Sequence, residues 1–392
     1  MKNNRHISED NGIDIYSSSK GKGKHSKGRQ HTSKKKGKRT AVIVVVSIVS
    51  VLAILVSSAF IYYNSILEKV QRGEFNVSNV EANNDVFTED VKNIALFGLD
   101  TRSDKMTGRA DAIMILTIDK KHNKIKMTSI ARDSYVDIEK ADGTVIKDKL
   151  THSYFFPEIY PAIWKKAAKE GKPTPTGAEV AVKAINKNFN MNITDYATIN
   201  FFGMVDIIDY IGGITLDIDS AEKEVMNTEY VPHLNDLGLK CAKITKTGEQ
   251  HVTGAQALAY ARNRYTSGDE VARGTRQREV LTACYTKVKT LGLTKFPKLI
   301  ELALSDCETS LSNGEITSIA SWAMLNSPSI ENLGLPDDDC NPKGGKEAII
   351  NDVWYYIYDL DIATQKIHDF INEEGSYVYP TTLTVSNNSG KS

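Results

Sequence analysis

The longest apolar run of the chain covers residues 41–63, where Val, Ile, Leu and Ala predominate and no charged residue occurs. A helix over this run would span about 34 Å, and the hydrocarbon core of a bilayer is about 30 Å thick. A helix buried in a protein core rarely lacks every charge over such a length. The run therefore predicts one transmembrane helix.

Beyond residue 91 the apolar positions predict a succession of strands and helices. Runs rich in Ile, Leu and Met predict strands at 93–99, 112–118 and 124–130, and the polar turn at 119–123 joins the last two into a hairpin. Apolar residues at helical spacing predict a helix at 176–189. Further predicted helices cover 200–211, 254–260, 275–291, 296–304, 315–325 and 361–371, and further predicted strands cover 214–218 and 330–335. This alternation predicts an α/β fold.

The composition of the segments on either side of the apolar run predicts how the chain is organised. Residues 1–40 hold 12 basic and 3 acidic residues among many Gly and Ser, which predicts a disordered basic tail. The positive-inside rule places that tail in the cytoplasm, and no small-residue cleavage site follows the run, so we expect an uncleaved signal anchor. Residues 64–91 predict a polar stalk. One extracytoplasmic domain at 92–375 and a flexible tail at 376–392 complete the expected organisation.

Charge narrows the possible partners. The chain has 49 basic and 49 acidic residues, so removing the tail leaves 37 basic against 46 acidic. An acidic remainder argues against a nucleic-acid-binding protein. The basic tail is better explained by attraction to anionic membrane lipid.

The four cysteines all lie after the apolar run and show no Cys-x-x-Cys spacing, which argues against structural zinc. Outside the membrane they can form up to two disulfides in three possible pairings, or they can remain free buried thiols. The sequence does not rank these alternatives. The cysteines are Cys241, Cys284, Cys307 and Cys340.

Familiar hydrolase and nucleotide-binding motifs are absent from the sequence. There is no Gly-x-Ser-x-Gly elbow and no His-Glu-x-x-His, and the residues at 344–347 lack the spacing of a Walker motif. His152, His233 and His251 are isolated, and we interpret them as structural or surface residues. The aromatic group at 354–358 is interpreted as packing.

Arginine is confined to two segments after residue 91, whereas lysine occurs along the whole length. A guanidinium group binds phosphate or carboxylate through two parallel hydrogen bonds, which an ammonium group does not do. The arginines are Arg102, Arg109, Arg132, Arg262, Arg264, Arg273, Arg276 and Arg278. Their confinement predicts an anion-binding site built from two segments. For 273–278 alone, the alternative is a set of ion pairs on a helix surface.

Strand topology brings the first of these segments to one edge. If the three strands form an antiparallel unit, the end of the first, the start of the second and the end of the third lie together. That edge holds Asp100, Arg102, Arg109, Asp111, Arg132 and Asp133. Mg²⁺ prefers one or two carboxylates with phosphate and water oxygens, so Asp100 and Asp111 are predicted metal ligands. The alternative is an ion-pair network at a sheet edge.

Around these residues the sequence resembles the LytR-CpsA-Psr family of membrane-anchored cell-wall enzymes. The similarity is clearest over 91–283 and weaker to 371. The motifs that carry it are FGLDTR at 97–102, RADAIM at 109–114, TSIARD at 128–133 and GAQALAYARNR at 254–264, followed by Asp269, Arg273 and Arg276-Gln277. The order of tail, anchor and stalk also matches.

The resemblance implies a fold with a mixed central β-sheet flanked by helices. It also implies transfer of a glycopolymer, of teichoic acid or capsular polysaccharide type, from polyprenyl pyrophosphate to peptidoglycan, with Mg²⁺, or alternatively Mn²⁺, as cofactor. Such an enzyme is a single-pass protein of the cell membrane. Two alternatives remain: a pyrophosphatase that releases the lipid carrier to water, and a non-catalytic regulatory protein that binds the carrier.

The resemblance also assigns roles to individual residues. Asp100 and Asp111 would hold the metal, and Arg132, Asp133 and Asp111 would be catalytic. Asp133 would either orient Arg132 or assist proton removal from the acceptor. The pyrophosphate would be bound by Arg109, Arg132, Arg262, Arg264 and Gln277, with Arg102 and Arg273 as further candidates. The lipid tail would lie in an apolar cavity that uses helices such as 200–211.

Two departures from the family pattern stand out. Ala131 occupies a position where the family usually has Pro. The segment 149–175 is longer than usual and lacks the common Gly-Gly. Because this segment would border the cleft, it leaves the choice of substrate open.

Overall fold

The computed structural model describes residues 71–84, 86–100, 108–266, 270–291, 307–340 and 347–373, together with 65, 68, 298–299 and 301–302. All of them belong to one unit, Tyr62–Ser392. The predicted tail at 1–40, the predicted anchor at 41–63 and the tail at 376–392 lie outside the described residues, as does most of the helix predicted at 296–304. Within the described ranges, every helix is too short or too polar to span a bilayer.

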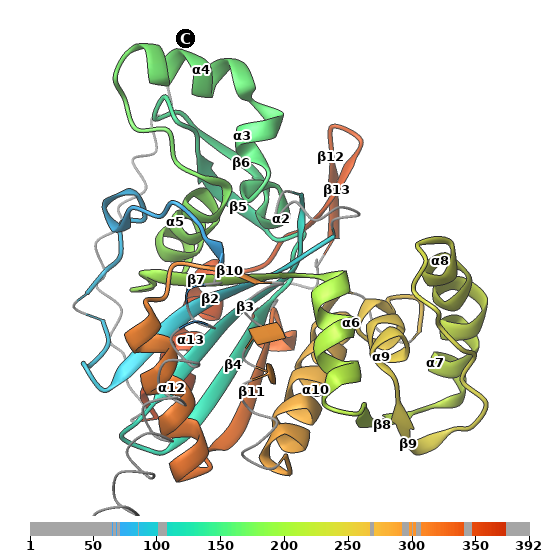
Figure 1. The fold of residues 1–392 in the computed structure, drawn as a ribbon. Helices are drawn as coiled ribbons and strands as arrows, with labels where there is room; N and C mark the ends of the chain where they lie inside the picture. The colour runs from blue at the N-terminus through green and yellow to red at the C-terminus, as the bar shows by residue number, and fades with distance from the viewer. Residues whose placement is uncertain are drawn as a thin grey trace, which may run out of the picture. The chain divides into compact units, whose positions relative to one another are not determined.

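A seven-stranded sheet forms the centre of the domain (Figure 1). Its order is β1 (Gln71–Arg72), β10 (Cys307–Thr309), β7 (Asp195–Asn200), β2 (Val91–Leu99), β3 (Ala110–Asp119), β4 (Lys124–Ile130) and β11 (Ser329–Leu335). β2 pairs antiparallel with β3, and β3 with β4, while β2 pairs parallel with β7, and β4 with β11. The prediction of a mixed central sheet is therefore confirmed.

The strands predicted from alternation are present with small changes of boundary. β4 matches 124–130, whereas β2 and β3 each extend beyond the predicted 93–99 and 112–118. β3 and β4 form the predicted hairpin, and Asn123 in its turn takes a positive φ of 54°. β7 was not predicted, because its sequence DYATIN lacks an apolar run.

Most predicted helices are present, and side-chain caps fix where several of them begin. α5 (Gly177–Phe189) and α9 (Gly254–Arg262) each start with a capping box, and Asn200 caps α6 (Phe201–Tyr210). A capping box satisfies free amides of the first turn. α10 (Glu270–Lys289) begins earlier than predicted. α12 (Asn313–Asn326) and α13 (Leu360–Asn372) occur close to 315–325 and 361–371.

Helices cover both faces of the sheet. On one face, α5 and α13 pack on Ala95, Phe97 and Ile113 in the largest apolar core. On the other face, α10 and α12 lie over Ile94 and Ile118 (Figure 1). Alternation along β2 explains this division, because neighbouring residues of a strand point to opposite faces.

A second apolar core lies within the segment that follows β7. It joins α6 and α9 to β8 (Ile214–Ile218), β9 (Gly248–Val252), α7 (Ser220–Val225), the π-helix η2 (Met226–Tyr230) and α8 (Val231–Asp236). The predicted strand 214–218 exists as β8, but it pairs only with β9 in the described part and stays outside the central sheet.

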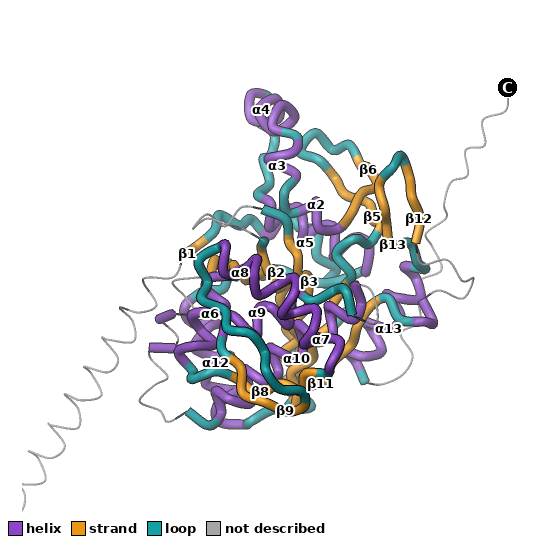
Figure 2. The backbone as a smooth tube through the Cα atoms, turned by 90° about the vertical axis from the view of Figure 1, so that its right-hand side faces the viewer, coloured by secondary structure: helices purple, strands orange, loops and turns teal. Residues whose placement is uncertain are grey.

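Two small hairpins lie side by side beyond the end of β4 (Figures 1 and 2). They are β5 (Tyr135–Glu139) with β6 (Val145–Lys149), and β12 (Glu347–Ile350) with β13 (Val353–Tyr356). The rings of Tyr135 and Tyr355 pack 4.7 Å apart between them. The long segment 149–175 is largely helical, as α2 (Leu150–Ser153), α3 (Phe156–Ile159) and α4 (Pro161–Lys169). Two 3₁₀ turns, η1 (Val77–Asn79) and η3 (Asp338–Cys340), complete the described elements.

None of the four cysteines, all of which the structure describes, forms a disulfide. Cys241 and Cys340 are buried, and Cys284 and Cys307 are partly buried. The sequence left open whether the cysteines form disulfides or remain thiols, and in this structure they remain thiols.

Candidate functional site

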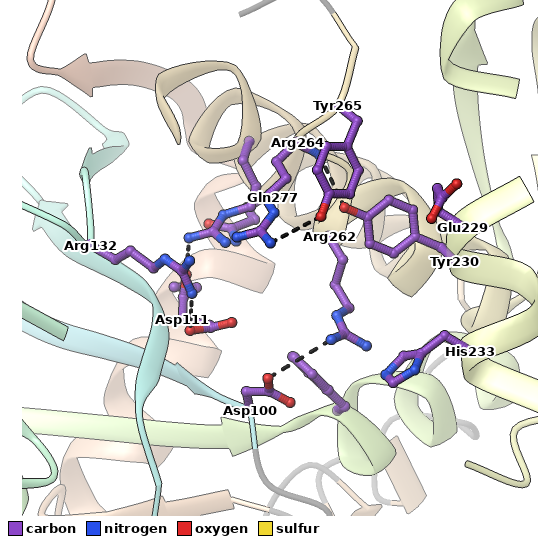
Figure 3. A pocket seen from close by; sticks show the side chains of 13 residues that line it. Asp100, Asp111, Arg132, Glu229, Tyr230, His233, Arg262, Arg264, Tyr265 and Gln277 are labelled. Atoms are coloured by element: carbon purple, nitrogen blue, oxygen red, sulfur yellow. Dashed lines mark hydrogen bonds and ion pairs between the residues drawn. The ribbon is translucent and has the colours of Figure 1, made fainter. Parts of the chain in front are cut away.

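A cavity of about 430 Å³ opens where β2 ends, β3 begins and β4 ends (Figure 3). It is lined by Asp100, Asp111, Ala112, Arg132, Phe201, Glu229, Tyr230, His233, Arg262, Arg264, Tyr265, Arg273 and Gln277. The four arginines outnumber the three carboxylates, so the empty cavity has an excess of positive charge. A site of this composition favours an anionic ligand.

Both arginine-bearing segments reach this cavity. Asp100 follows β2, and Arg262 ends α9; its Nη2 lies 3.8 Å from Asp100 Oδ2. Arg273 and Gln277 come from the first half of α10. α10 lies close to β4 at Gly274, where a Cβ would lie 2.8 Å from Ser129 Oγ. A side chain at that position would push the helix and its two cavity residues away from the sheet.

Arg132 is held by two carboxylates. Its Nη1 donates to Asp111 Oδ1 at 2.5 Å, and its Nε donates to Asp133 Oδ2 at 3.3 Å. Asp133 also receives Lys149 Nζ on its Oδ1 at 2.9 Å. Asp133 is 5 % exposed and is not among the cavity-lining residues. The position of Asp133 therefore suits a residue that orients Arg132, which is the first of the two roles considered for Asp133.

Arg262 has an unused hydrogen-bonding group. Its guanidinium carbon lies 4.6 Å from the centre of the Phe201 ring, so the group is stacked in place. Among the described residues its buried Nη1 has no hydrogen-bond partner. A buried donor left without an acceptor costs about 1–3 kcal/mol. An anionic ligand oxygen in the cavity would remove that cost.

Arg264 and Arg273 have different environments within the same wall. Arg264 Nη2 donates to the Tyr265 hydroxyl at 3.0 Å, and this hydrogen bond raises the pKa of Arg264. Arg273 is buried, and its Nη2 donates to the main-chain oxygen of Asp111 at 2.9 Å. Arg273 therefore ties α10 to the start of β3, beside the carboxylate of Asp111.

Arg276 and Arg278 do not line the cavity, and they are not on the helix surface either. Arg276 Nε donates to Glu222 Oε1 at 2.7 Å, and its other nitrogens donate to Asn263 O and Thr266 Oγ1. It thus holds the loop after α9. Arg278 donates to the hydroxyl of Ser129, and burial lowers its pKa. In this structure neither arginine lines the cavity, and Arg276 forms a buried ion pair in place of a pair on the helix surface.

Two other predicted arginines are not placed in the cavity. Arg109 has an exposed side chain and is absent from the cavity lining, although its main-chain oxygen accepts a hydrogen bond from Asp100 N at 3.2 Å. Arg102, like Asp269, lies outside the described residues. Of the predicted pyrophosphate-binding residues, the described cavity thus brings together Arg132, Arg262, Arg264, Arg273 and Gln277.

Besides Ala112, five lining residues were missed or dismissed by the sequence analysis: Phe201, Glu229, Tyr230, His233 and Tyr265. None of them belongs to a motif with a chemical signature. Tyr230 lies in the π-helical turn η2, and a π-helix has no reliable sequence pattern. His233 was interpreted as structural because it has no partner close in the sequence.

The donor set of Asp100 and Asp111 suits a divalent cation. Carboxylate oxygens are the protein ligands that Mg²⁺ prefers. A second group, Asp119, His122 and Glu373, has metal-type side chains within reach of one another. Lys126 Nζ lies 3.0 Å from Asp119 and 2.8 Å from Glu373, so an ammonium group already neutralises that cluster. Asp100 and Asp111 are the better metal candidates.

Comparison with known proteins agrees with this architecture. The model of the LytR_cpsA_psr family matches residues 55–369. The chain is 28 % identical over 280 residues to the polyisoprenyl-teichoic acid–peptidoglycan teichoic acid transferase TagU of Bacillus cereus. The aligned region covers 69 % of this chain and 76 % of TagU. Such relatives are named as transferases of teichoic acid.

Solved structures share the fold. Protein gbs0355 of Streptococcus agalactiae superposes with a TM-score of 0.56 at 22 % identity, covering 74 % of this chain and 90 % of that one. TagT of Bacillus subtilis, solved bound to LI-WTA, superposes with a TM-score of 0.51 at 21 % identity, covering 76 % of this chain and 94 % of TagT. Because the family model covers most of the chain, including the central sheet and the whole arginine cavity, this chain belongs to the LytR_cpsA_psr family.

Proposed function

We propose that this protein is a Mg²⁺-dependent phosphotransferase that moves a glycopolymer from polyprenyl pyrophosphate to peptidoglycan. The observation that carries the proposal is the cavity in which Arg132, Arg262 and Arg264 surround an open space with Asp100 and Asp111 at its edge. A pyrophosphate needs several cationic donors and a divalent cation to be held in a reactive orientation. The names of the relatives supply the teichoic-acid and peptidoglycan chemistry.

In this proposal Asp100 and Asp111 hold the cation, which when bound would neutralise charge on the pyrophosphate oxygens. Mn²⁺ is the alternative ion. Arg262 offers its unused Nη1 to a phosphate oxygen, and Arg132, oriented by Asp133, offers its planar head from the opposite wall. Arg264 and Gln277 complete the binding surface.

The transfer needs no protein nucleophile. The acceptor hydroxyl attacks the phosphorus that carries the sugar, and the bond between that phosphorus and the bridging oxygen breaks. The electron pair leaves with the prenyl phosphate, whose negative charge the arginines stabilise. The polymer remains attached to the acceptor through a phosphodiester.

A second cavity provides space for the prenyl chain. α12 has no fully buried residue in the described structure, although its Ile316, Ile319 and Trp322 face the sheet. An apolar cavity of about 320 Å³ lies between α10 and α12, lined by residues such as Tyr285 and Ala320. The cavity is partly open to solvent, and its lining is mostly apolar. We propose that the lipid tail occupies this space beside α10 and α12. The resemblance implied a cavity that uses helices such as 200–211, and α6 contributes Phe201 to the lining of the arginine cavity.

The proposed location follows from the sequence outside the described residues. An anchor at 41–63 with a cytoplasmic basic tail would hold the catalytic domain outside the cell membrane, close to a lipid-linked substrate. The basic tail would contact anionic lipid on the inner face.

The test is a transfer assay with purified full-length protein in lipid, a prenyl-pyrophosphate-linked glycan, Mg²⁺ and peptidoglycan. We expect acceptor-dependent labelling of peptidoglycan that chelation abolishes. Arg132→Ala should remove it, and Arg72→Ala, an exposed arginine elsewhere, is the matched control. Release of prenyl phosphate without acceptor would instead indicate the pyrophosphatase. Binding without turnover would indicate the regulatory carrier-binding protein.

A further inference from the structure

One wall of the cavity has no role in the proposed function. It is formed by Glu229 and Tyr230 of η2 and by His233 of α8, opposite Arg132 and Asp111 (Figure 3). A π-helical turn changes the direction in which the following side chains point, and such turns are frequent at functional sites. Here the turn is followed by a histidine whose ring points into the cavity.

His233 differs from the other histidines that the structure describes. His122 contacts Asp119, His152 contacts Asp148, and both His251 and His368 contact a main-chain oxygen. Among the described residues, the ring of His233 makes no hydrogen bond or ion pair, although it is half-buried. A half-buried imidazole without a protein partner has both ring nitrogens available to a ligand.

A metal-binding role does not fit His233. The three-residue group in the described structure that is arranged to hold a metal is Asp119, His122 and Glu373, so His233 does not form one with the cavity carboxylates. Two of those carboxylates already face a guanidinium group: Asp111 is bound to Arg132, and Asp100 lies 3.8 Å from Arg262. The proton of an attacking hydroxyl needs another acceptor.

We propose that His233 is the general base that takes this proton, an inference that rests on the proposed transferase function. As the acceptor hydroxyl oxygen bonds to the sugar-bearing phosphorus, its proton moves to a ring nitrogen of His233. The bridging P–O bond breaks, and its electron pair leaves with the prenyl phosphate. His233 then returns the proton to solvent, so no other reactant is consumed.

The test compares His233→Gln and His233→Ala with the unaltered protein in the transfer assay between about pH 5.5 and 8.5. The unaltered enzyme should gain rate as pH rises through this range, because only the deprotonated form of a general base can accept the proton. His233→Gln should lower kcat about 100-fold, leave KM nearly unchanged and lose that rise. Added imidazole should restore part of the activity of His233→Ala.

The control is His251→Gln, because His251 is exposed and its Nε2 lies 2.7 Å from Gly212 O, a contact that a glutamine amide can keep. Its activity and pH profile should match those of the unaltered enzyme. The control changes none of the charged and titratable groups that line the cavity with His233, which are Asp100, Asp111, Arg132, Glu229, Tyr230, Arg262, Arg264, Tyr265 and Arg273.

Several results would overturn the inference. They are an unchanged pH profile in His233→Gln, a change in KM alone, or a loss of activity that imidazole does not rescue. The same loss of pH dependence in Glu229→Gln, with His233→Gln active, would assign the base to Glu229. Absence of transfer by the unaltered protein would reject the proposed function and this inference with it, whereas transfer by an active His233→Gln would reject this inference alone.

Discussion

Arg262 Nη2 lies 3.8 Å from Asp100 Oδ2, so the end of α9 meets the end of β2 at one cavity. This distance is longer than a hydrogen bond, and the guanidinium is stacked on Phe201 while its Nη1 has no partner among the described residues. The pair is therefore arranged to leave a position for a third, anionic group between the two segments.

Arg262→Lys should reduce kcat/KM for transfer by about 10- to 100-fold, because lysine keeps the charge but loses the planar fork and the stacking on Phe201. Transfer kinetics and the Tm of the purified protein measure this. Arg72→Lys should leave both unchanged. Full activity of Arg262→Lys would mean that only charge matters at this position.

Asp133→Asn should lower kcat about 10-fold, because Arg132 and Lys149 lose the carboxylate that holds them. The shape of the pH profile should stay the same, since Asp133 contacts Arg132 and does not line the cavity. If the variant instead loses its pH dependence, Asp133 is the proton acceptor and the role given to His233 is wrong.

Arg276→Ala should lower the free energy of unfolding by about 3–5 kcal/mol, since it leaves the buried Glu222 without its partner. Chemical denaturation measures the change, and the double variant Arg276→Met, Glu222→Leu should recover part of it. Stability unaffected by Arg276→Ala would show that the pair is not a determinant of this part of the fold.

Glu315 should make stability depend on pH in the acid range. Burial raises its pKa, but hydrogen bonds from Lys92 and Ser312 outweigh burial and lower the pKa to about 2. The stabilisation is therefore complete above the unfolded value of 4.5 and is lost as pH falls toward about 2. Because the pair is partly exposed, Glu315→Gln should remove no more than about 1 kcal/mol. Chemical denaturation at pH 6 and pH 3 should show that Glu315→Gln loses less free energy of unfolding between these pH values than the unaltered protein does. Equal losses in the two proteins would show that Glu315 does not cause the pH dependence.

Ala320→Trp should weaken binding of long-chain prenyl pyrophosphate at least about 10-fold, because the indole fills the apolar space between α10 and α12. Binding of inorganic pyrophosphate should be unaffected. The matched control is Ser321→Trp, which places the same side chain on an exposed position of α12. Equal affinity of both variants for the long-chain ligand would exclude this space as the lipid site.

The local sequence pattern was sufficient to predict the three strands at the centre of the sheet. β2, β3 and β4 are runs of apolar residues joined by a polar turn, and short-range pairing in a hairpin follows from that order. The positions of Asp100, Asp111 and Arg132 then followed from which strand ends meet. β7 was missed, because its place beside β2 depends on a distant pairing that its own polar sequence does not indicate.

Tertiary structure decided which residues of the arginine-rich segments face the ligand. Arg273 and Arg276 are one helical turn apart, yet the first lines the cavity and the second is buried against Glu222. His233 likewise faces the cavity only because η2 and α8 fold back over the end of α9. The sequence by itself determined the chemistry available to this protein, namely two carboxylates and a set of guanidinium groups. Which of these groups share one cavity depends on packing between segments far apart in the chain, and no local pattern encodes that packing.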